Sequence, residues 1–157
     1  MFKHILVPTD GSATSQRASV EVAEMIPATS GTKVTLLLAI SVMKAEETDF
    51  DPDIVDKHNA ALYQKAEVAL EKASRLFAIR GHDFETKIIE GDPVSAAIAG
   101  EVKNGDYDLI VMGSRGLGMH KTDMHYLGSV TEHVIRRVDI PVLVIPIHKL
   151  SKGRDEE

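Results

Sequence analysis

The chain has 157 residues, of which 43 % are hydrophobic and 27 % charged, values that are ordinary for one soluble globular domain. The 18 basic and 24 acidic residues give a net charge of −6, which argues against a general binder of nucleic acids or anionic membranes because nothing offsets repulsion from phosphates. The lack of cysteine excludes disulfides, thiolate catalysis and zinc sites built on cysteine. No apolar run is long enough to span a membrane and no export signal is evident, so the cytoplasm is the expected location.

Short apolar runs alternate with stretches of helical periodicity, a pattern that indicates βαβ units and a parallel sheet. Residues 2–7 predict a first strand that is covered on both faces. A turn is predicted at 8–12, after which Ser12 or Thr14 can cap a helix that reaches residue 26. A second buried strand is predicted at 34–40. The residues expected on the inner face of the first helix follow a helical period: Ala18, Val22 and Met25.

The middle of the chain contains an acidic stretch and then a long segment without Gly or Pro. Residues 43–53 predict a mobile, solvated loop, because the glycine and terminal glutamate of a calcium-binding EF-hand are missing. Residues 54–80 predict a long amphipathic helix, and Gly81 stands where a left-handed C-terminal cap belongs. Residues 84–90 alternate in polarity and predict a third strand nearer an edge of the sheet.

The last third continues the alternation of helices and strands. Asp92 and Pro93 predict the N-cap and first residue of a helix that ends near residue 104. A fourth strand is predicted at 108–112 and, after Pro141, a fifth at 142–147. The residues expected on the inner face of the intervening helix are Val130, Val134 and Ile135. The sequence therefore predicts an open three-layer α/β sheet of five parallel strands in a single domain over 1–150, followed by a polar tail over 151–157.

Glycines gather in the segment that follows the fourth strand. In an open parallel sheet, ligands bind beyond the carboxyl ends of the strands where the strand order reverses, and the segments 8–12, 39–42 and 113–129 are expected there. Three glycines within 113–118 let the backbone approach a ligand closely, and Gly128 and Ser129 open a helix whose free N–H groups favour an anion. These parts predict a phosphate cradle, although they match neither a Walker A loop nor a dinucleotide fingerprint.

Three sets of motifs carry a resemblance to a known family. The segment 5–12, with sequence ILVPTDGS, resembles the opening of the universal stress protein family. The segment 108–118, DLIVMGSRGLG, resembles its fourth-strand signature, and 128–135 with 141–144 resembles its ending. The resemblance covers 2–147. It implies a Rossmann-like, five-stranded parallel sheet with helices on both faces, an adenine nucleotide as ligand, and a homodimer formed through the fifth strand.

The resemblance also implies the roles of individual residues toward ATP and an accompanying Mg or Mn ion. Asp10 would contact the ribose or the metal, and the backbone of Ala39 would lie by the adenine. The glycine-rich turn would approach the ribose and phosphates, and the start of the last helix would hold the phosphate chain. A turn role for Asp10 and an exposed loop position for Arg115 are the alternatives. The full predicted site comprises Pro8, Thr9, Asp10, Ala39, Met112, Gly113, Arg115, Gly116, Gly128, Ser129 and Val130.

The spacing of the glycines departs from the family pattern. ATP-binding members have nine residues between the second and third glycines of the motif, whereas eleven lie between Gly116 and Gly128 here. A two-residue insertion is the preferred interpretation. We expect the segment 117–127 to form a flap from which Lys121 can reach a terminal phosphate, with an exposed loop that makes no ligand contact as the alternative.

The function predicted from these features is that of an ATP-binding stress-response regulatory protein, a binding module whose state depends on nucleotide. A nucleotide-free stress protein of the same fold that acts through protein interactions is the alternative. ADP, AMP and a cyclic nucleotide are alternatives to ATP. No catalytic lysine, arginine finger or positioned base can be named, so we expect slow ATP hydrolysis at most.

Overall fold

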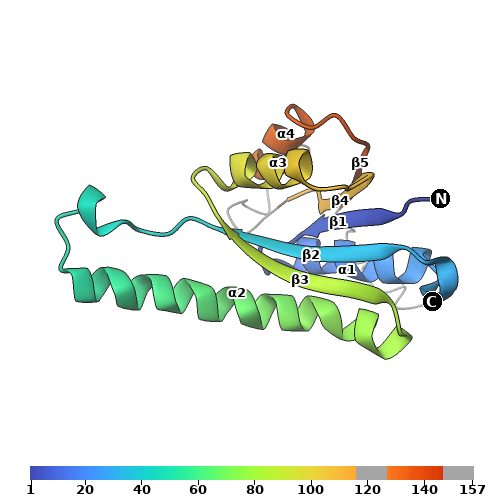
Figure 1. The fold of residues 1–157 in the computed structure, drawn as a ribbon, viewed down its shortest axis with the longest axis horizontal. Coiled ribbons are helices and arrows are strands. Elements are labelled where there is room, and N and C mark those ends of the chain that lie inside the picture. Colours follow the sequence, from blue (N-terminus) through green and yellow to red (C-terminus); the bar gives the residue numbers. More distant parts are fainter. Residues whose placement is uncertain (116–126, 147–157) are drawn as a thin grey trace, which may run out of the picture.

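The computed structural model describes residues 1–115 and 127–146 and confirms the predicted fold class. Its five strands are parallel and lie in the order β3-β2-β1-β4-β5 (Figure 1). The strands are β1 (His4–Pro8), β2 (Lys33–Ile40), β3 (Asp83–Glu90), β4 (Leu109–Gly113) and β5 (Val142–Ile145). The helices are α1 (Ala13–Met25), α2 (Pro52–Arg80), α3 (Val94–Asn104) and α4 (Ser129–Ile135), with short 3-10 turns η1 (Ala28–Ser30) and η2 (Ala45–Glu47). In the part of the chain that is described, no helix has the length and apolar character needed to cross a membrane.

Helices cover both faces of the sheet, which is why the central strands are continuously apolar. Helices α1 and α2 lie on one face, and α3 and α4 lie on the other (Figure 1). All five residues of β1 and all five of β4 are buried. The strand at one edge, β3, is largely exposed, as its alternating polarity predicted.

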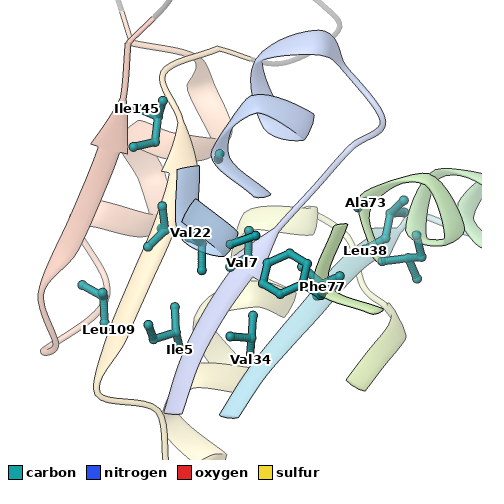
Figure 2. Packing of buried hydrophobic residues seen from close by; sticks show 14 of the residues in the cluster. Ile5, Val7, Val22, Val34, Leu38, Ala73, Phe77, Leu109 and Ile145 are labelled. Carbon is teal, nitrogen blue, oxygen red and sulfur yellow. The ribbon is translucent and has the colours of Figure 1, made fainter. Parts of the chain in front are cut away.

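Alternate residues of β1 enter the two hydrophobic cores, as the period of a strand requires. Ile5 and Val7 pack on the α1 and α2 face, whereas Leu6 packs on the α3 and α4 face. The ring of Phe77, from α2, lies against this first core beside Val7 and Val34 and is fully buried (Figure 2). The cores fix the strands from both sides, so the strand ends become rigid points from which the loops depart.

Polar contacts join three neighbouring strands near the amino ends of the sheet. His4 Nδ1 lies 2.7 Å from Asp106 Oδ1, and His4 Nε2 lies 2.8 Å from Thr35 Oγ1. The Thr35 hydroxyl donates to Glu85 Oε1 at 2.9 Å, and Lys33 Nζ lies 3.0 Å from Glu85 Oε2. The hydrogen bonds from Lys33 and Thr35 hold the pKa of the Glu85 carboxyl below its ordinary value of 4.5. This cluster fixes the end of the sheet opposite to the one where ligands are expected.

Two helices differ from the predicted boundaries at their start. The long helix α2 begins at Pro52 because Asp51 is its N-cap and accepts the N–H of Asp53 at 2.8 Å. It ends as predicted at Gly81, whose φ of 74° is left-handed. Helix α3 begins after Pro93, which is itself the N-cap, so the predicted cap at Asp92 is wrong. Pro93 has the extended backbone of a cap residue, and its carbonyl accepts the first helical N–H groups.

Two side chains predicted to face inward are exposed. Met25 is the last residue of α1, and the extended backbone that follows turns Ile26 toward the core in its place. Ile135 stands one position, about 100°, around the helix from the buried Val134, and Val138 continues the inner face instead. The fifth strand is described to Ile145, and residue 147 of the predicted strand lies outside the described residues.

Candidate functional site

A cavity of about 330 Å³ lies at the carboxyl ends of the strands, where the strand order reverses. From β1 the chain continues to β2 and β3 on one side, and α3 then carries it back to β4 on the other side of β1. The loops after β1 and β4 therefore depart in different directions, which opens a crevice between them. The cavity is lined by Pro8, Thr9, Asp10, Ser15, Ala39, Val94, Ile98, Met112, Gly113, Arg115, Gly128, Ser129, Val130 and Thr131.

The cavity brings together every predicted site residue that the structure describes. Gly116 lies outside the described residues, and so do 117–126 of the predicted flap, including Lys121. Sequence reasoning missed four lining residues, which are Ser15, Val94, Ile98 and Thr131. Three of these sit in the first turns of helices, and the i, i+4 spacing of Val94 and Ile98 on α3 was the available signal for an apolar wall.

The loop after β1 is organised around the hydroxyl of Ser15. Ser15 Oγ donates to Asp10 Oδ1 at 2.9 Å and lies 2.8 Å from Thr9 Oγ1. Asp10 Oδ1 also accepts the N–H of Ser12 at 2.9 Å. Ser12 Oγ accepts the N–H of Ser15 at 3.2 Å, so Ser12, not Thr14, caps α1. Asp10 thus has the turn role that the sequence allowed, and it lines the cavity as well.

The backbone of Ala39 faces the cavity side of β2. Thr9 N–H donates to Leu37 O at 2.7 Å, so the peptide groups of Leu37 point toward β1, whereas the carbonyl of Ile40 accepts a hydrogen bond from the chain beyond β3. The direction in which the backbone N–H and C=O groups point alternates from one residue to the next along a strand. The N–H and C=O of Ala39 therefore point to the β1 side, as those of Leu37 do. Pairing between β1 and β2 ends with Pro8 opposite Leu37. The N–H and C=O of Ala39 thus extend into the space beyond the end of β1.

Two hydrogen bonds join the end of β4 to the start of α4. Gly128 N–H donates to Ser114 O at 2.8 Å, and the buried Thr131 hydroxyl donates to Gly113 O at 2.9 Å. The Gly128 N–H is therefore already hydrogen-bonded within the protein. Of the N–H groups predicted to bind an anion, only the later ones in the first turn of α4 are available. The N–H groups of residues 129–131 have no hydrogen-bond acceptor among the described residues. Both ends of the predicted cradle are fixed to each other.

Gly113 is required for packing between elements. A Cβ at Gly113 would lie 2.9 Å from Thr14 Cγ2 and 3.0 Å from the Thr14 carbonyl carbon and oxygen. These atoms belong to the first turn of α1, which packs against the end of β4. The sequence interpretation, that this glycine makes room for a ligand, is thus incomplete: its missing side chain makes room for α1.

Arg115 is the buried cation of the cavity. It is 6 % exposed, and its Nη2 atom has no hydrogen-bond partner among the described residues. This burial excludes the alternative that Arg115 is an exposed loop side chain. A buried guanidinium N–H without a partner costs free energy, so the site favours an anionic ligand that can accept from it. No group of three or more His, Asp or Glu side chains in the described part of the chain could hold a metal ion on its own.

The fold and the position of the cavity define an open, doubly wound α/β protein with a site at its topological switch point. The family model described as "Universal stress protein family" matches residues 1–146. A universal stress protein of Synechocystis is 32 % identical over 93 % of this chain and 87 % of its own length. The structure of MJ0577 from Methanocaldococcus jannaschii has a TM-score of 0.80 and 30 % identity, over 96 % of this chain and 99 % of its own.

A further solved relative is a universal stress protein in complex with cAMP, which has a TM-score of 0.58 and 28 % identity. The similarity covers 92 % of this chain and 97 % of that protein. Because the family model covers nearly the whole chain and the relatives align over most of their own lengths, the chain belongs to the universal stress protein family.

Replacing Gly113 by alanine tests how closely α1 packs on β4. We expect Gly113→Ala to lower the free energy of unfolding by about 1–3 kcal/mol, because the new methyl meets backbone atoms of Thr14 that cannot move alone. Gly100→Ala is the matched control, since Gly100 lies inside α3 and a Cβ added there would have nothing within 4 Å, and it should raise that free energy by about 0.5–1 kcal/mol. Urea unfolding of both variants measures the difference. Equal stability of Gly113→Ala and the wild type would contradict the packing argument.

Proposed function

We propose that this protein binds ATP with a divalent cation in the cavity between β1 and β4 and acts in the cytoplasm as a nucleotide-dependent regulatory module of the stress response. The observation that carries the proposal is the buried, partly unpartnered guanidinium of Arg115 on the wall of that cavity. A phosphate group offers this guanidinium a planar pair of acceptors and the opposite charge. A bound phosphate therefore supplies the hydrogen-bond acceptor whose absence costs the ligand-free protein free energy.

The cavity also suits an adenine ring. Part of its wall is apolar and includes Val94, Ile98 and Met112, and the last two are buried. At its edge, the N–H and C=O of Ala39 form a donor and acceptor pair, which complements the amino group and ring nitrogens of adenine. The relative solved with cAMP, which contains adenine, ribose and phosphate, supports an adenine nucleotide as the ligand class. The cavity volume of about 330 Å³ falls in the range of small-molecule sites.

Asp10 is the residue we assign to the cation. A carboxylate together with phosphate oxygens is a typical ligand set for magnesium in nucleotide sites, so one protein carboxylate is sufficient. Asp10 and Arg115 are the two ionisable side chains among the described lining residues. Among the described lining residues there is no further ionisable side chain to activate a water molecule for attack on the γ-phosphate, which supports binding rather than rapid turnover as the role of the site.

The role of Arg115 is tested by Arg115→Met, which keeps the length of the side chain and removes the donor group. We expect about 10–100-fold weaker ATP binding in titration calorimetry, because a hydrogen bond to a charged group is lost. Adenosine, which lacks phosphate, should bind equally to both proteins. The unfolding free energy should stay level or rise, because the unpartnered buried donor is gone.

Arg137→Met, at an exposed arginine outside the cavity, controls for the change in net charge. If the wild type shows no ATP binding at millimolar concentration, the nucleotide-free alternative replaces the proposal.

We also propose that two copies associate through β5. The two edge strands differ in how readily they can pair with another chain. Charged side chains on an edge strand disfavour such pairing, whereas apolar side chains do not. The edge strand β3 carries Asp83, Glu85, Lys87 and Glu90, whereas β5 has the sequence VLVI. An apolar cavity of about 430 Å³ lies beside β5 and includes the exposed side chains of Phe2 and Met25. A second copy that pairs with β5 would cover this apolar surface.

The dimer is tested by a proline at the outward-facing position of β5. Ser114 N–H donates to Ile145 O, so by alternation the N–H of Leu143 points toward β4 and the N–H of Val144 points outward. Val144→Pro therefore removes one donor from the open edge and none from the ladder with β4. We expect light scattering at micromolar concentration to give a dimer mass for the wild type and a monomer mass for Val144→Pro. A monomeric wild type would overturn the proposal.

A further inference from the structure

We propose that Ser15 is a positioning residue, which holds the carboxylate of Asp10 in the orientation that nucleotide binding requires. The inference rests on the proposed function, because it concerns the same cavity. Ser15 lines that cavity from the first turn of α1 and is 5 % exposed. The sequence drew attention to Asp10, whereas Ser15 emerges only from the contacts that the folded loop makes.

The hydroxyl of Ser15 is the point at which the polar groups of the loop after β1 converge. It receives the N–H of Asp10 at 3.3 Å and the hydroxyl of Ser12 at 3.2 Å. Its possible acceptors are Asp10 Oδ1 at 2.9 Å, Ser12 O at 3.0 Å and Thr9 Oγ1 at 2.8 Å. A hydroxyl has one proton, and a carboxylate is the strongest acceptor of the three, so the proton belongs to the bond with Asp10.

The same hydroxyl therefore holds both the backbone and the side chain of Asp10. Oδ1 of Asp10 accepts from two donors, the N–H of Ser12 and the hydroxyl of Ser15. Two donors that reach one oxygen from different directions fix the rotation of the carboxylate more tightly than one donor does. The Ser12 donor is a backbone group that no substitution with alanine can remove. Ser15 is therefore a side chain through which substitution can change the orientation of Asp10.

Loss of the Ser15 hydroxyl has two separable effects. One is structural, since the part-buried Asp10 N–H and the buried Ser12 hydroxyl each lose an acceptor. The other concerns binding, since the Asp10 carboxylate keeps its bond with the Ser12 N–H, loses the one with the Ser15 hydroxyl, and changes its orientation. Any loss of ATP affinity through the first effect would be the same whether or not residue 10 carries a carboxylate. The second effect requires that carboxylate, so a double-mutant cycle separates the two.

The test is calorimetric titration of ATP and Mg²⁺ into the wild type, Ser15→Ala, Asp10→Ala and the double variant. We expect Ser15→Ala to weaken binding about tenfold, in line with the strength of a hydrogen bond to a charged group. In the Asp10→Ala background the same substitution should have no further effect. Losses that multiply in the double variant would overturn the proposal and leave Ser15 with a structural role.

Ser19→Ala is the matched control. Ser19 lies one turn further along α1, is 1 % exposed, and its hydroxyl donates to the Ser15 carbonyl at 3.4 Å. It should destabilise the fold without changing the affinity for ATP. If the wild type binds no ATP, the proposed function fails, and a crystal structure of ligand-free Ser15→Ala still decides the positioning claim. An Asp10 carboxylate that keeps its wild-type orientation in that structure would contradict the claim, and a rotated carboxylate would support it.

Discussion

The reversal of strand order between β1 and β4 is the constraint on which the site depends. In the order β3-β2-β1-β4-β5, the two central neighbours β1 and β4 lead to segments on different sides of the sheet. The crevice between these segments cannot be filled by a crossover helix, since α1 leaves toward one face and α3 covers the other (Figure 1). A cavity at this position is therefore a consequence of the topology, and the side chains around it determine what it binds.

The walls of this cavity are held by contacts that link distant segments. Thr131 and Gly128 attach the first turn of α4 to the end of β4, and Thr14 of α1 occupies the space where Gly113 lacks a side chain. Behind the strand ends, Phe77 and its neighbours pack one face of the sheet (Figure 2). Arg115 differs from these well-packed residues, because it is buried and its Nη2 atom has no hydrogen-bond acceptor among the described residues. Such a rigid and incomplete arrangement suits a ligand that supplies the missing acceptor.

The sequence predicted those parts of the fold that local rules determine. Apolar runs located the strands, and Gly81 ended α2 because the left-handed φ of 74° favours glycine. Contacts between distant segments were not predictable from one sequence. The hydrogen bonds of the Ser15 hydroxyl depend on how the loop after β1 folds back. The need for a glycine at position 113 depends on where α1 packs. Local rules also placed Met25 inside, although the chain leaves the helix at that residue and turns Ile26 inward instead.

The proposed function requires that an adenine nucleotide occupies the cavity at the switch point. A crystal structure of the protein grown with ATP and Mg²⁺ tests it most directly. We expect the adenine ring beside the backbone of Ala39, phosphate oxygens within hydrogen-bond distance of the Arg115 guanidinium, and the Asp10 carboxylate facing the ribose or the metal. A nucleotide seated in the apolar cavity beside β5, or an Arg115 side chain that makes no contact with a bound phosphate, would contradict it.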